Sequence, residues 1–474
     1  MSTLRAAPVA RTAITPLIIG TALLMQGLEG TAIATALPAM AQGFGESPIR
    51  LNLAISTYLL CVAVFIPVSG WIADRFGARN VFCLAMGLFV VSSMMCGLSQ
   101  NLAELVAARA LQGVAGALMT PVGRIVLLRT TPRADLVRAM SMLTVPAVLG
   151  PIIGPPLGGL IVQAASWRWI FLLSAPIGVA GVWAALAFIP NVRGGAKTPL
   201  DLAGFSLAGI GVAALVVGLG ALGQPHGLAP VLALFLIGAL CLAAFAWRHG
   251  RVRHPILDLG LLRVPTFRIA VVGGSVWRIA MATTPLLLVM LLQVGFGLSP
   301  LQSGLISFAG AMGALLMKGP ASPILHRLGF RRVLIANTLL SGLLAASLAL
   351  FQPTTPHAVI FAVLLLGGFS RSLNYTSLSA LCYADMGERS LSSASAMASM
   401  SQELSQSFGA ALAAVLLQAA LLAHGGARLT AGDVSLAFLA AGLLSLGGLP
   451  FFLRLPHDAG ALINGARPAL AAAE

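Results

Sequence analysis

The chain has 474 residues, of which 58% are hydrophobic and 9% charged, and its mean hydropathy is +0.96. Soluble domains carry about a quarter charged residues, so this composition excludes an ordinary soluble protein and indicates a helical membrane protein. The formal net charge of +15 does not indicate nucleic-acid binding, because the basic residues lie in short segments between long apolar runs. The expected partner is the lipid bilayer.

The apolar runs are continuous and about 20 residues long, which predicts membrane-spanning helices and disfavours a barrel. The fold class predicted is therefore an all-α polytopic membrane protein with fourteen transmembrane helices. The predicted spans are 13–37, 51–72, 80–99, 102–127, 138–163, 168–189, 202–222, 229–247, 269–294, 302–324, 333–351, 357–383, 394–422 and 433–454. The first run follows Arg5 and Arg11 without a convincing cleavage site, so we expect a span there and no cleaved signal peptide.

The loops between the spans predict the orientation. An even number of spans places both termini on one side, and the loops of that side hold twenty Lys and Arg residues against three on the other. Because cytoplasmic loops are enriched in Lys and Arg, both termini are predicted to be cytoplasmic.

The first span contains Glu29, with Gln26 on roughly the same helical face. An ionised carboxylate is costly in lipid, so Glu29 is expected to face a cavity or a partner. A group there, whose proton affinity depends on burial and on neighbouring cations, can load and release a proton as the cavity changes sides. The alternative is a static ion pair that locks the span in place.

Within the first hundred residues, glycines and charged residues are most concentrated where the second predicted span ends. The pattern consists of Gly70, Asp74, Arg75, Gly77 and Arg79. Glycine allows two helix ends to approach closely, and Asp74 can cap a helix or pair with Arg75 or Arg79. An ordinary basic cytoplasmic loop is the alternative interpretation.

A related pattern, from His326 to Arg332, follows about 252 residues later and predicts an internal repeat. Duplicated six-helix halves with a site between them are a recurring plan in transporters. Six spans precede residue 190 and six follow residue 268. We therefore predict an N-terminal bundle over 1–190, a linker with two extra helices over 191–268, a C-terminal bundle over 269–456 and a cytoplasmic tail over 457–474.

Spans four and five carry the clearest polar and small-residue patterns. Span four has Arg109, Gln112 and Gly113 on one face, which suits a water-filled groove or a tight helix contact. Arg109 is expected either to modulate a cavity carboxylate or to act as a structural clamp. Span five places glycines at helical spacing among prolines, which favours close packing and bends, with lipid-facing glycine as the alternative. Its residues are Gly150, Pro151, Gly154, Pro155, Gly158 and Gly159.

The C-terminal half has further charged and polar residues within its spans. They are Arg278, Lys318, Arg371, Asn374, Gln402 and Glu403. Such groups are functional-site candidates by default, and Arg278 or Arg371 could pair with Glu403. With Arg109 and Arg124, the spans hold five basic residues away from their ends, against the acidic Glu29 and Glu403, which leaves room for neutral or anionic amphiphiles.

Metal and cofactor sites are not predicted. The five cysteines lie in apolar runs without a C-x-x-C pair, and the seven histidines show no metal-ligand spacing. No phosphate loop of P-loop spacing is present, which disfavours ATP as the driving force, and no nucleophile motif indicates an enzyme.

Several of these segments match family signatures. Leu28–Pro38 looks like a helix 1 signature, Gly70–Arg79 like the loop signature G-x-x-x-D-R-x-G-x-R, Arg109–Gly113 like R-x-x-Q-G, and Gly150–Gly159 like an antiporter motif. Over nearly its whole length the chain resembles the fourteen-helix drug:proton antiporters of the major facilitator superfamily, the EmrB/QacA type. Glu29 stands where the family usually has Asp, and Ala34 and Ser174 stand where Asn is common.

The resemblance implies proton-driven efflux of small amphiphilic compounds across a bacterial cytoplasmic membrane, without a cofactor. From their position within the spans, Glu29, Arg109 and Glu403 are expected to take part in proton coupling. The expected substrate cavity consists of Gln26, Gln112, Gly113, Arg278, Arg371, Asn374 and Gln402. The alternatives are export of a single metabolite, with an anion among the candidates, and a non-transporting membrane sensor. Some relatives use a periplasmic adaptor, and nothing in the sequence identifies one.

Overall fold

The computed structural model describes residues 9–131, 135–191, 199–222, 227–252, 255–387, 390–426, 429–456 and 459. These ranges form helices joined by short connections, without strands. Within them, thirteen helices are long and apolar enough to cross a membrane, and a bent pair makes a fourteenth span. The prediction of an all-α protein with fourteen spans is confirmed.

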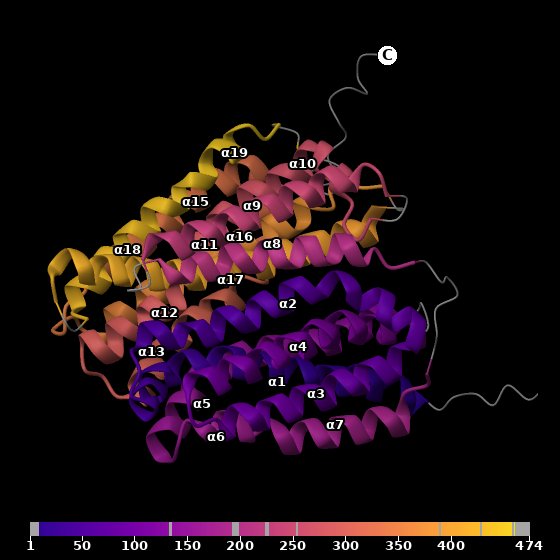
Figure 1. Cartoon of the computed structure of the whole chain (residues 1–474), viewed down its shortest axis with the longest axis horizontal. Helices are drawn as coiled ribbons and strands as arrows, with labels where there is room; N and C mark the ends of the chain where they lie inside the picture. The colour runs from indigo at the N-terminus through magenta and orange to yellow at the C-terminus, as the bar shows by residue number, and fades with distance from the viewer. Residues whose placement is uncertain are drawn as a thin grey trace, which may run out of the picture.

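The first seven helices form one bundle, which lies in the lower half of Figure 1. They are α1 (Val9–Phe44), α2 (Pro48–Phe76), α3 (Ala78–Leu98), α4 (Leu102–Thr130), α5 (Leu136–Ala164), α6 (Arg168–Leu172) and α7 (Ser174–Phe188). Helix α1 packs along α5, and α4 lies between α2 and α3. The connections are short, and Asn101 begins α4 by accepting a hydrogen bond from the Glu104 amide at 2.9 Å.

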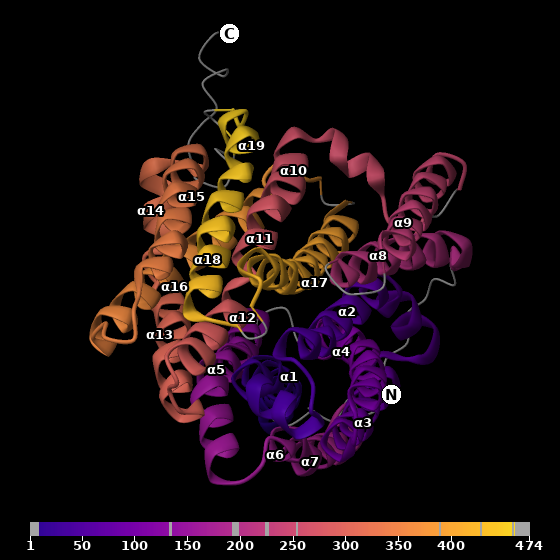
Figure 2. The same cartoon turned by 60° about the vertical axis from the view of Figure 1, so that its left-hand side comes forward.

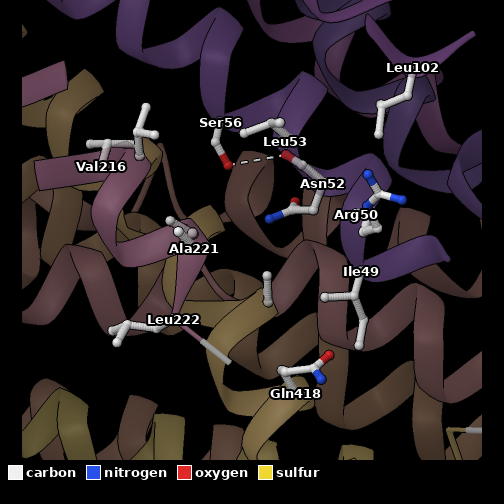
Figure 3. A pocket seen from close by; sticks show the side chains of 14 residues that line it. Ile49, Arg50, Asn52, Leu53, Ser56, Leu102, Val216, Ala221, Leu222 and Gln418 are labelled. Atoms are coloured by element: carbon white, nitrogen blue, oxygen red, sulfur yellow. Dashed lines mark hydrogen bonds between the residues drawn. The ribbon is translucent and has the colours of Figure 1, made fainter. Parts of the chain in front are cut away.

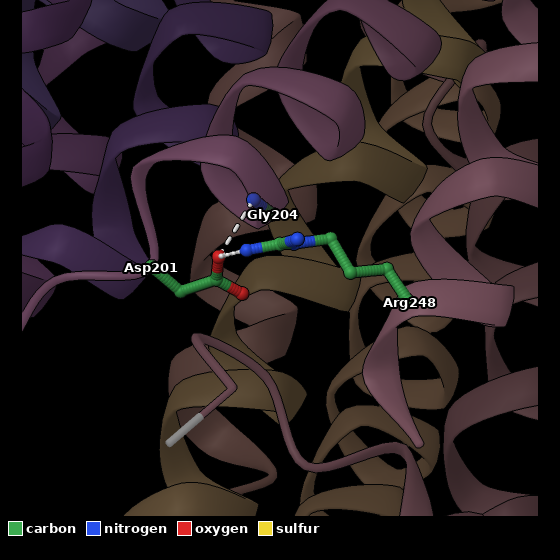
Figure 4. Close-up of polar contacts among 3 residues, drawn as sticks. All are labelled: Asp201, Gly204 and Arg248. Carbon is green, nitrogen blue, oxygen red and sulfur yellow. Dashed lines mark hydrogen bonds and ion pairs between the residues drawn. The ribbon is translucent and has the colours of Figure 1, made fainter. Parts of the chain in front are cut away.

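Two further helices, α8 (Leu202–Ala221) and α9 (Leu228–His249), stand beside α2 and α17 at the edge of the molecule (Figure 2). Asp201 begins α8 and joins the pair, because its carboxylate accepts bonds from the Gly204 amide at 2.9 Å and from Arg248 at 3.3 Å (Figure 4). Arg248 lies in the last turn of α9, so this ion pair connects the start of one helix to the end of the next.

The remaining helices form the second bundle. They are α10 (Pro265–Arg268), α11 (Gly274–Met281), α12 (Thr284–Val289), α13 (Pro300–Leu316), α14 (Ala321–Leu328), α15 (Phe330–Ser347), α16 (His357–Leu381), α17 (Leu391–His424), α18 (Ala431–Ser445) and α19 (Leu449–Leu453). Helices α10 to α12 belong to one span, Pro265–Gly295, with π-helical turns at Ile269–Gly273 and Met290–Gly295.

The structure corrects one predicted span. The run over 302–324 is not a single straight helix, because α13 ends at Leu316 and α14 begins at Ala321 with a bend of 57°. Gly319 and Pro320 lie at this break, and proline lacks the amide that would continue the helix ladder.

The two repeated patterns have the same local geometry. Helix α2 ends at Phe76, Gly77 adopts φ +92°, and α3 begins at Ala78. In the second bundle α14 ends at Leu328, Gly329 adopts φ +76°, and α15 begins at Phe330. Positive φ favours glycine, so both halves use the same residue at the same turn.

The apolar core shows how the two bundles meet. One cluster of buried residues spans both bundles, uniting Leu37 and Leu51 with Leu291 and Leu417. This end of the molecule, opposite the Gly77 turn, is called the joined end here. The other end, which carries Arg75, Arg129, Arg248, Arg327 and Arg454, is called the basic end, and toward it the core divides into one cluster from the first bundle and one built mainly from the second.

Hydrogen bonds near the joined end reinforce the contact. Asn52 donates to the Ala410 carbonyl at 2.5 Å, and Ser407 donates to the Ser56 carbonyl at 3.0 Å, both between α2 and α17. Gln293 donates to the carbonyl of Thr35 at 2.9 Å. The bundles are therefore held together at one end, and they enclose a cavity farther toward the basic end.

Candidate functional site

The central cavity has a volume of about 550 Å³ and is lined by both bundles. Its lining extends from Thr35 and Asn52 near the joined end to Lys318 near the end of α13. Two tyrosines face it from opposite bundles, Tyr58 on α2 and Tyr375 on α16. Most other lining residues are aliphatic, so the cavity suits an amphiphilic molecule.

The charged residues of the lining are all basic. They are Arg109, Lys318 and Arg371, and the lining residues include no Asp or Glu. The carboxyl of Glu29 lies outside this cavity although its neighbours Gly30 and Thr31 line it. Because Glu29 points to the opposite side of α1, it is buried within the first bundle and not exposed to lipid.

Three side chains from three helices surround the Glu29 carboxyl, which is 2% exposed. Ser93 of α3 and Ser174 of α7 both contact its Oε1 atom, the latter at 2.9 Å. Gln112 of α4 donates to Oε2 at 2.6 Å. The sequence predicted that Glu29 would face either a cavity or a partner. The structure shows partners, and all three of them are uncharged polar side chains.

The Ser93 hydroxyl can serve either protonation state of Glu29. Its oxygen contacts Glu29 Oε1 and also lies 2.9 Å from the Phe171 carbonyl oxygen. A hydroxyl has a single proton to donate, together with acceptor lone pairs. Ser93 can therefore donate to an ionised Glu29, or accept from a protonated Glu29 while donating to Phe171. The pocket satisfies both states without moving the backbone.

Gln112 connects this pocket to the cavity. Its Oε1 accepts a hydrogen bond from Arg109 at 2.5 Å while its Nε2 donates to Glu29. Arg109 also donates to the Ala54 carbonyl at 3.3 Å, and its guanidinium stacks over the Tyr58 ring at 4.1 Å. Arg109 thus contacts α2 as a clamp and reaches the carboxyl of Glu29 through a single amide.

A second polar chain crosses the first bundle closer to the basic end. Gln26 donates to the Tyr58 hydroxyl at 2.9 Å and accepts from Thr120 at 2.9 Å. Gly113 permits the approach of α4 to α2, since a Cβ there would lie 2.6 Å from the Cβ of Cys61. The sequence left two alternatives for this face of α4, a water-filled groove or a tight helix contact. At Gly113 the structure shows the tight contact.

The structure corrects the expected pairing in the second bundle. Glu403 forms no ion pair with Arg278 or Arg371 among the described residues, and its carboxylate accepts one bond, from Gln406 at 3.4 Å. Arg278 is buried, its guanidinium lies 5.8 Å from the Tyr375 ring, and its Nε has no hydrogen-bond partner. The two arginines lie on α11 and α16, and each approaches Tyr375 instead of α17.

The expected cavity residues therefore occupy different places. Arg371 lines the cavity, whereas Gln26, Gln112 and Gly113 lie behind it in the first bundle. Asn374 is fully buried and faces Thr338 of α15, to which it donates at 3.3 Å. Gln402, like Arg278, lies outside the lining in this conformation.

The glycines of α5 pack against two other helices. A Cβ on Gly150 would lie 2.8 Å from the Leu24 carbonyl oxygen, and one on Gly158 would lie 2.9 Å from the Cα of Ala32, both on α1. Gly154 meets the Thr31 side chain on the same helix. Gly159 instead meets the Pro300 backbone of α13, across the boundary between the bundles. Pro151 and Pro155 both line the cavity.

The Gly70–Arg79 segment lies at the basic end, and it is not the loop expected from the sequence: it consists of the end of α2 and the start of α3, joined at Gly77. Asp74 pairs with Arg129 of α4 at 2.5 Å, and not with Arg75 or Arg79 as the sequence suggested. Arg75 lies over the Trp71 ring, and Arg79 donates to the Ile189 carbonyl at 3.4 Å. The position of a Cβ on Gly70 is open, so this glycine makes no close contact here.

A smaller cavity of about 200 Å³ lies between α2, α8 and α17 near the joined end. Asn52 borders both cavities, and Figure 3 shows it beside Ser56, with Gln418 of α17 and Leu222, which follows α8, facing it. This cavity has a single charged lining residue, the exposed Arg50, and lies away from Glu29. The central cavity is therefore the candidate site.

Two important residues were not recognised from the sequence. Tyr58 is one of only three tyrosines in the chain, so its place in a predicted span was a usable signal. Ser93 lies in an apolar run where nothing distinguishes it from Ser92. Within the described part of the chain, no group of three His, Cys, Asp or Glu residues could hold a metal ion.

Comparisons with known proteins agree on the family. The family model described as Major Facilitator Superfamily matches residues 19–410 and 272–472. The putative multidrug resistance protein MdtD of Escherichia coli O6:H1 is 37% identical over 449 residues, which are 93% of this chain and 94% of that protein. Its counterpart in Escherichia fergusonii is 38% identical over 405 residues, covering 84% and 85%.

Two solved structures share the fold at low sequence identity. A bacterial homolog of the human lysosomal transporter Spinster, in an inward-facing and unoccupied conformation, has a TM-score of 0.68 at 13% identity and covers 98% of this chain and 100% of its own. The nucleoside transporter NupG has a TM-score of 0.61 at 13% identity, with coverages of 94% and 100%.

Proposed function

The chain belongs to the Major Facilitator Superfamily, and on this premise we propose that it exports small amphiphilic compounds in exchange for protons by alternating access. Its relatives are named as multidrug resistance proteins, which supports cargo of this kind. The central cavity between the bundles, apolar with a few polar groups, supports a site for such molecules. The proton gradient supplies the driving force, and no cofactor takes part.

The arrangement around Glu29 is the observation that carries the proposal. A carboxyl group buried among Ser93, Ser174 and Gln112 has hydrogen-bond partners in both its ionised and its protonated form. Intramembrane carboxylates of this kind mark proton pathways. Through Gln112 and Arg109, the state of this carboxyl acts on the lining of the cavity.

The orientation follows from the distribution of basic residues. The basic end faces the cytoplasm, because cytoplasmic connections are enriched in Lys and Arg. The two bundles meet at the joined end, so this conformation presents the cavity toward the cytoplasm, where cargo is loaded. Each entering proton contributes about 2.3 kcal/mol per 100 mV of membrane potential.

A Glu29→Gln variant tests the proposal. Glutamine has the shape of a protonated glutamate and retains most of the hydrogen bonds of the pocket, so the protein is expected to fold. We expect transport driven by an imposed pH gradient to fall to background in proteoliposomes. Exchange of labelled for unlabelled cargo across the membrane, which needs no proton, should continue.

The matched control is Glu104→Gln, because Glu104 is exposed at the start of α4 and far from the cavity. This variant should transport like the unmodified protein. Full pH-driven transport by Glu29→Gln would remove Glu29 from the mechanism. Loss of exchange as well as of pH-driven transport would indicate a structural role for Glu29.

A further inference from the structure

The balance of charge in and around the central cavity indicates which cargo it accepts. Its charged lining residues are Arg109, Lys318 and Arg371, and Arg278 lies just behind Tyr375. Arg109 has the Glu29 carboxyl one amide away as a counter-charge. Arg371 and Arg278 have no carboxylate within ion-pair distance among the described residues.

Buried cations without counter-charges are costly in a membrane protein. Arg278 is 3% exposed and its Nε has no hydrogen-bond partner. Two acidic residues lie in the described spans of this bundle. Glu403 is bonded to Gln406, and Asp433 accepts from the Thr430 amide at the start of α18, at the joined end. An anion in the cavity beside Arg371 would supply the missing negative charge.

The rest of the lining describes the body of the ligand. Ile55, Leu59 and Ile152 from the first bundle face Leu286 and Val289 from the second. Tyr58 and Tyr375 add an aromatic ring from each side. An apolar or aromatic body fits between these residues, and it leaves the charged group of the ligand beside Arg371.

We propose that the cavity selects amphiphiles that carry a carboxylate, sulfonate or phosphate group, and that Arg371 is the residue that binds this group. This inference deepens the proposed export function and rests on it for its physiological meaning. Lys318 is exposed at the end of α13, on the way from the basic end to the cavity, and attracts the same anions. Lipophilic cations are disfavoured because they would add to an unbalanced positive charge.

The test uses two probes with the same aromatic body and permanent charges of opposite sign. Naphthalene-2-sulfonate and (2-naphthyl)trimethylammonium are titrated by calorimetry into the full chain in lipid nanodiscs, with empty nanodiscs as the blank. No pH gradient is present, so the measurement is independent of proton coupling. We expect the sulfonate to bind at least roughly tenfold more tightly, as charge-assisted bonds to an arginine in the cavity lining allow.

Variants then assign the charge to its residue. Arg371→Gln should weaken sulfonate binding by roughly tenfold, and Arg371→Lys should restore part of it. Arg124→Gln is the matched control, because Arg124 lies in a span but is exposed and outside the lining. That variant should bind the sulfonate like the unmodified protein.

Equal or tighter binding of the ammonium probe, or no binding of the sulfonate, overturns the proposal without any variant being needed. An unchanged sulfonate affinity in a folded Arg371→Gln protein overturns the role of Arg371. These results can be distinguished from results that contradict the proposed export function. Sulfonate binding without pH-driven transport would contradict proton coupling alone, and pH-driven transport of cations alone would contradict anion selection alone.

Discussion

At the scale of single residues, the contact between Gln112 and its two charged neighbours is open to test. Gln112→Leu removes the donor to Glu29 and the acceptor for Arg109, so two buried groups lose a partner. Each loss costs about 1–3 kcal/mol. We expect a clear fall in the thermal midpoint of the purified protein and loss of pH-driven transport.

Ser93→Ala is a milder change in the same pocket, and its effect can be compared with that of Gln112→Leu. Glu29 keeps Ser174 and Gln112 in that variant, so the thermal midpoint should fall less than in Gln112→Leu. Ser93 nevertheless serves both protonation states of Glu29, so pH-driven transport should weaken more than exchange does. Equal transport by Ser93→Ala and the unmodified protein would exclude that role.

Sequence could identify Glu29 and Arg371, because charges stand out within apolar runs. It could not identify their partners. Gln112 and Asn374 look equally polar in a sequence, yet the rotation of each helix turns one toward Glu29 and the other toward Thr338. Ser93 gave no signal at all, since a serine in a membrane helix more often bonds its own helix backbone, as Ser92 does here.

At the scale of helices, the glycines of α5 determine how closely α1 approaches. Gly154→Ala would place a methyl group on Thr31 of α1, and such overpacking costs about 1–3 kcal/mol. We expect a lower thermal midpoint and impaired transport, because α1 carries Glu29. Gly70→Ala is the control, since its Cβ position is open and alanine stabilises a helix interior by about 0.5–1 kcal/mol.

Helix number and order followed from hydropathy, because each span must be apolar over a fixed length. The details within spans depend on packing that hydropathy does not report. The Gly319–Pro320 pair did mark the break between α13 and α14, although the predicted span ran through it. The π-helical turns beside α11 and α12 had no equivalent signal in the sequence.

At the scale of the whole molecule, alternating access predicts opposite movements of the two ends. Spin labels at Phe76 and Leu328 report on the basic end, and labels at Gln42 and Gln302 report on the joined end. All four side chains are exposed, so labels there should not disturb the core. In pulsed dipolar measurements, changing pH or adding cargo should shorten one distance as the other lengthens.

The labels require a background in which the five native cysteines are replaced. A pair at Leu328 and Leu350, both in the second bundle, is the internal control and should keep its distance throughout. Distances that change in the same sense at both ends, or a moving control pair, would contradict rigid rocking of two bundles.

Because the charged residues that line the central cavity are all basic, selection of anionic cargo has an electrical consequence for the cell. When a monovalent anion leaves as one proton enters, both movements carry positive charge inward, and two elementary charges cross per cycle. The membrane potential then contributes about 4.6 kcal/mol per 100 mV, twice the value for a single charge. A carrier of monovalent cations with the same exchange ratio would be electrically silent. Turnover of this protein should therefore generate a current, and at a constant pH gradient it should slow when the voltage is collapsed.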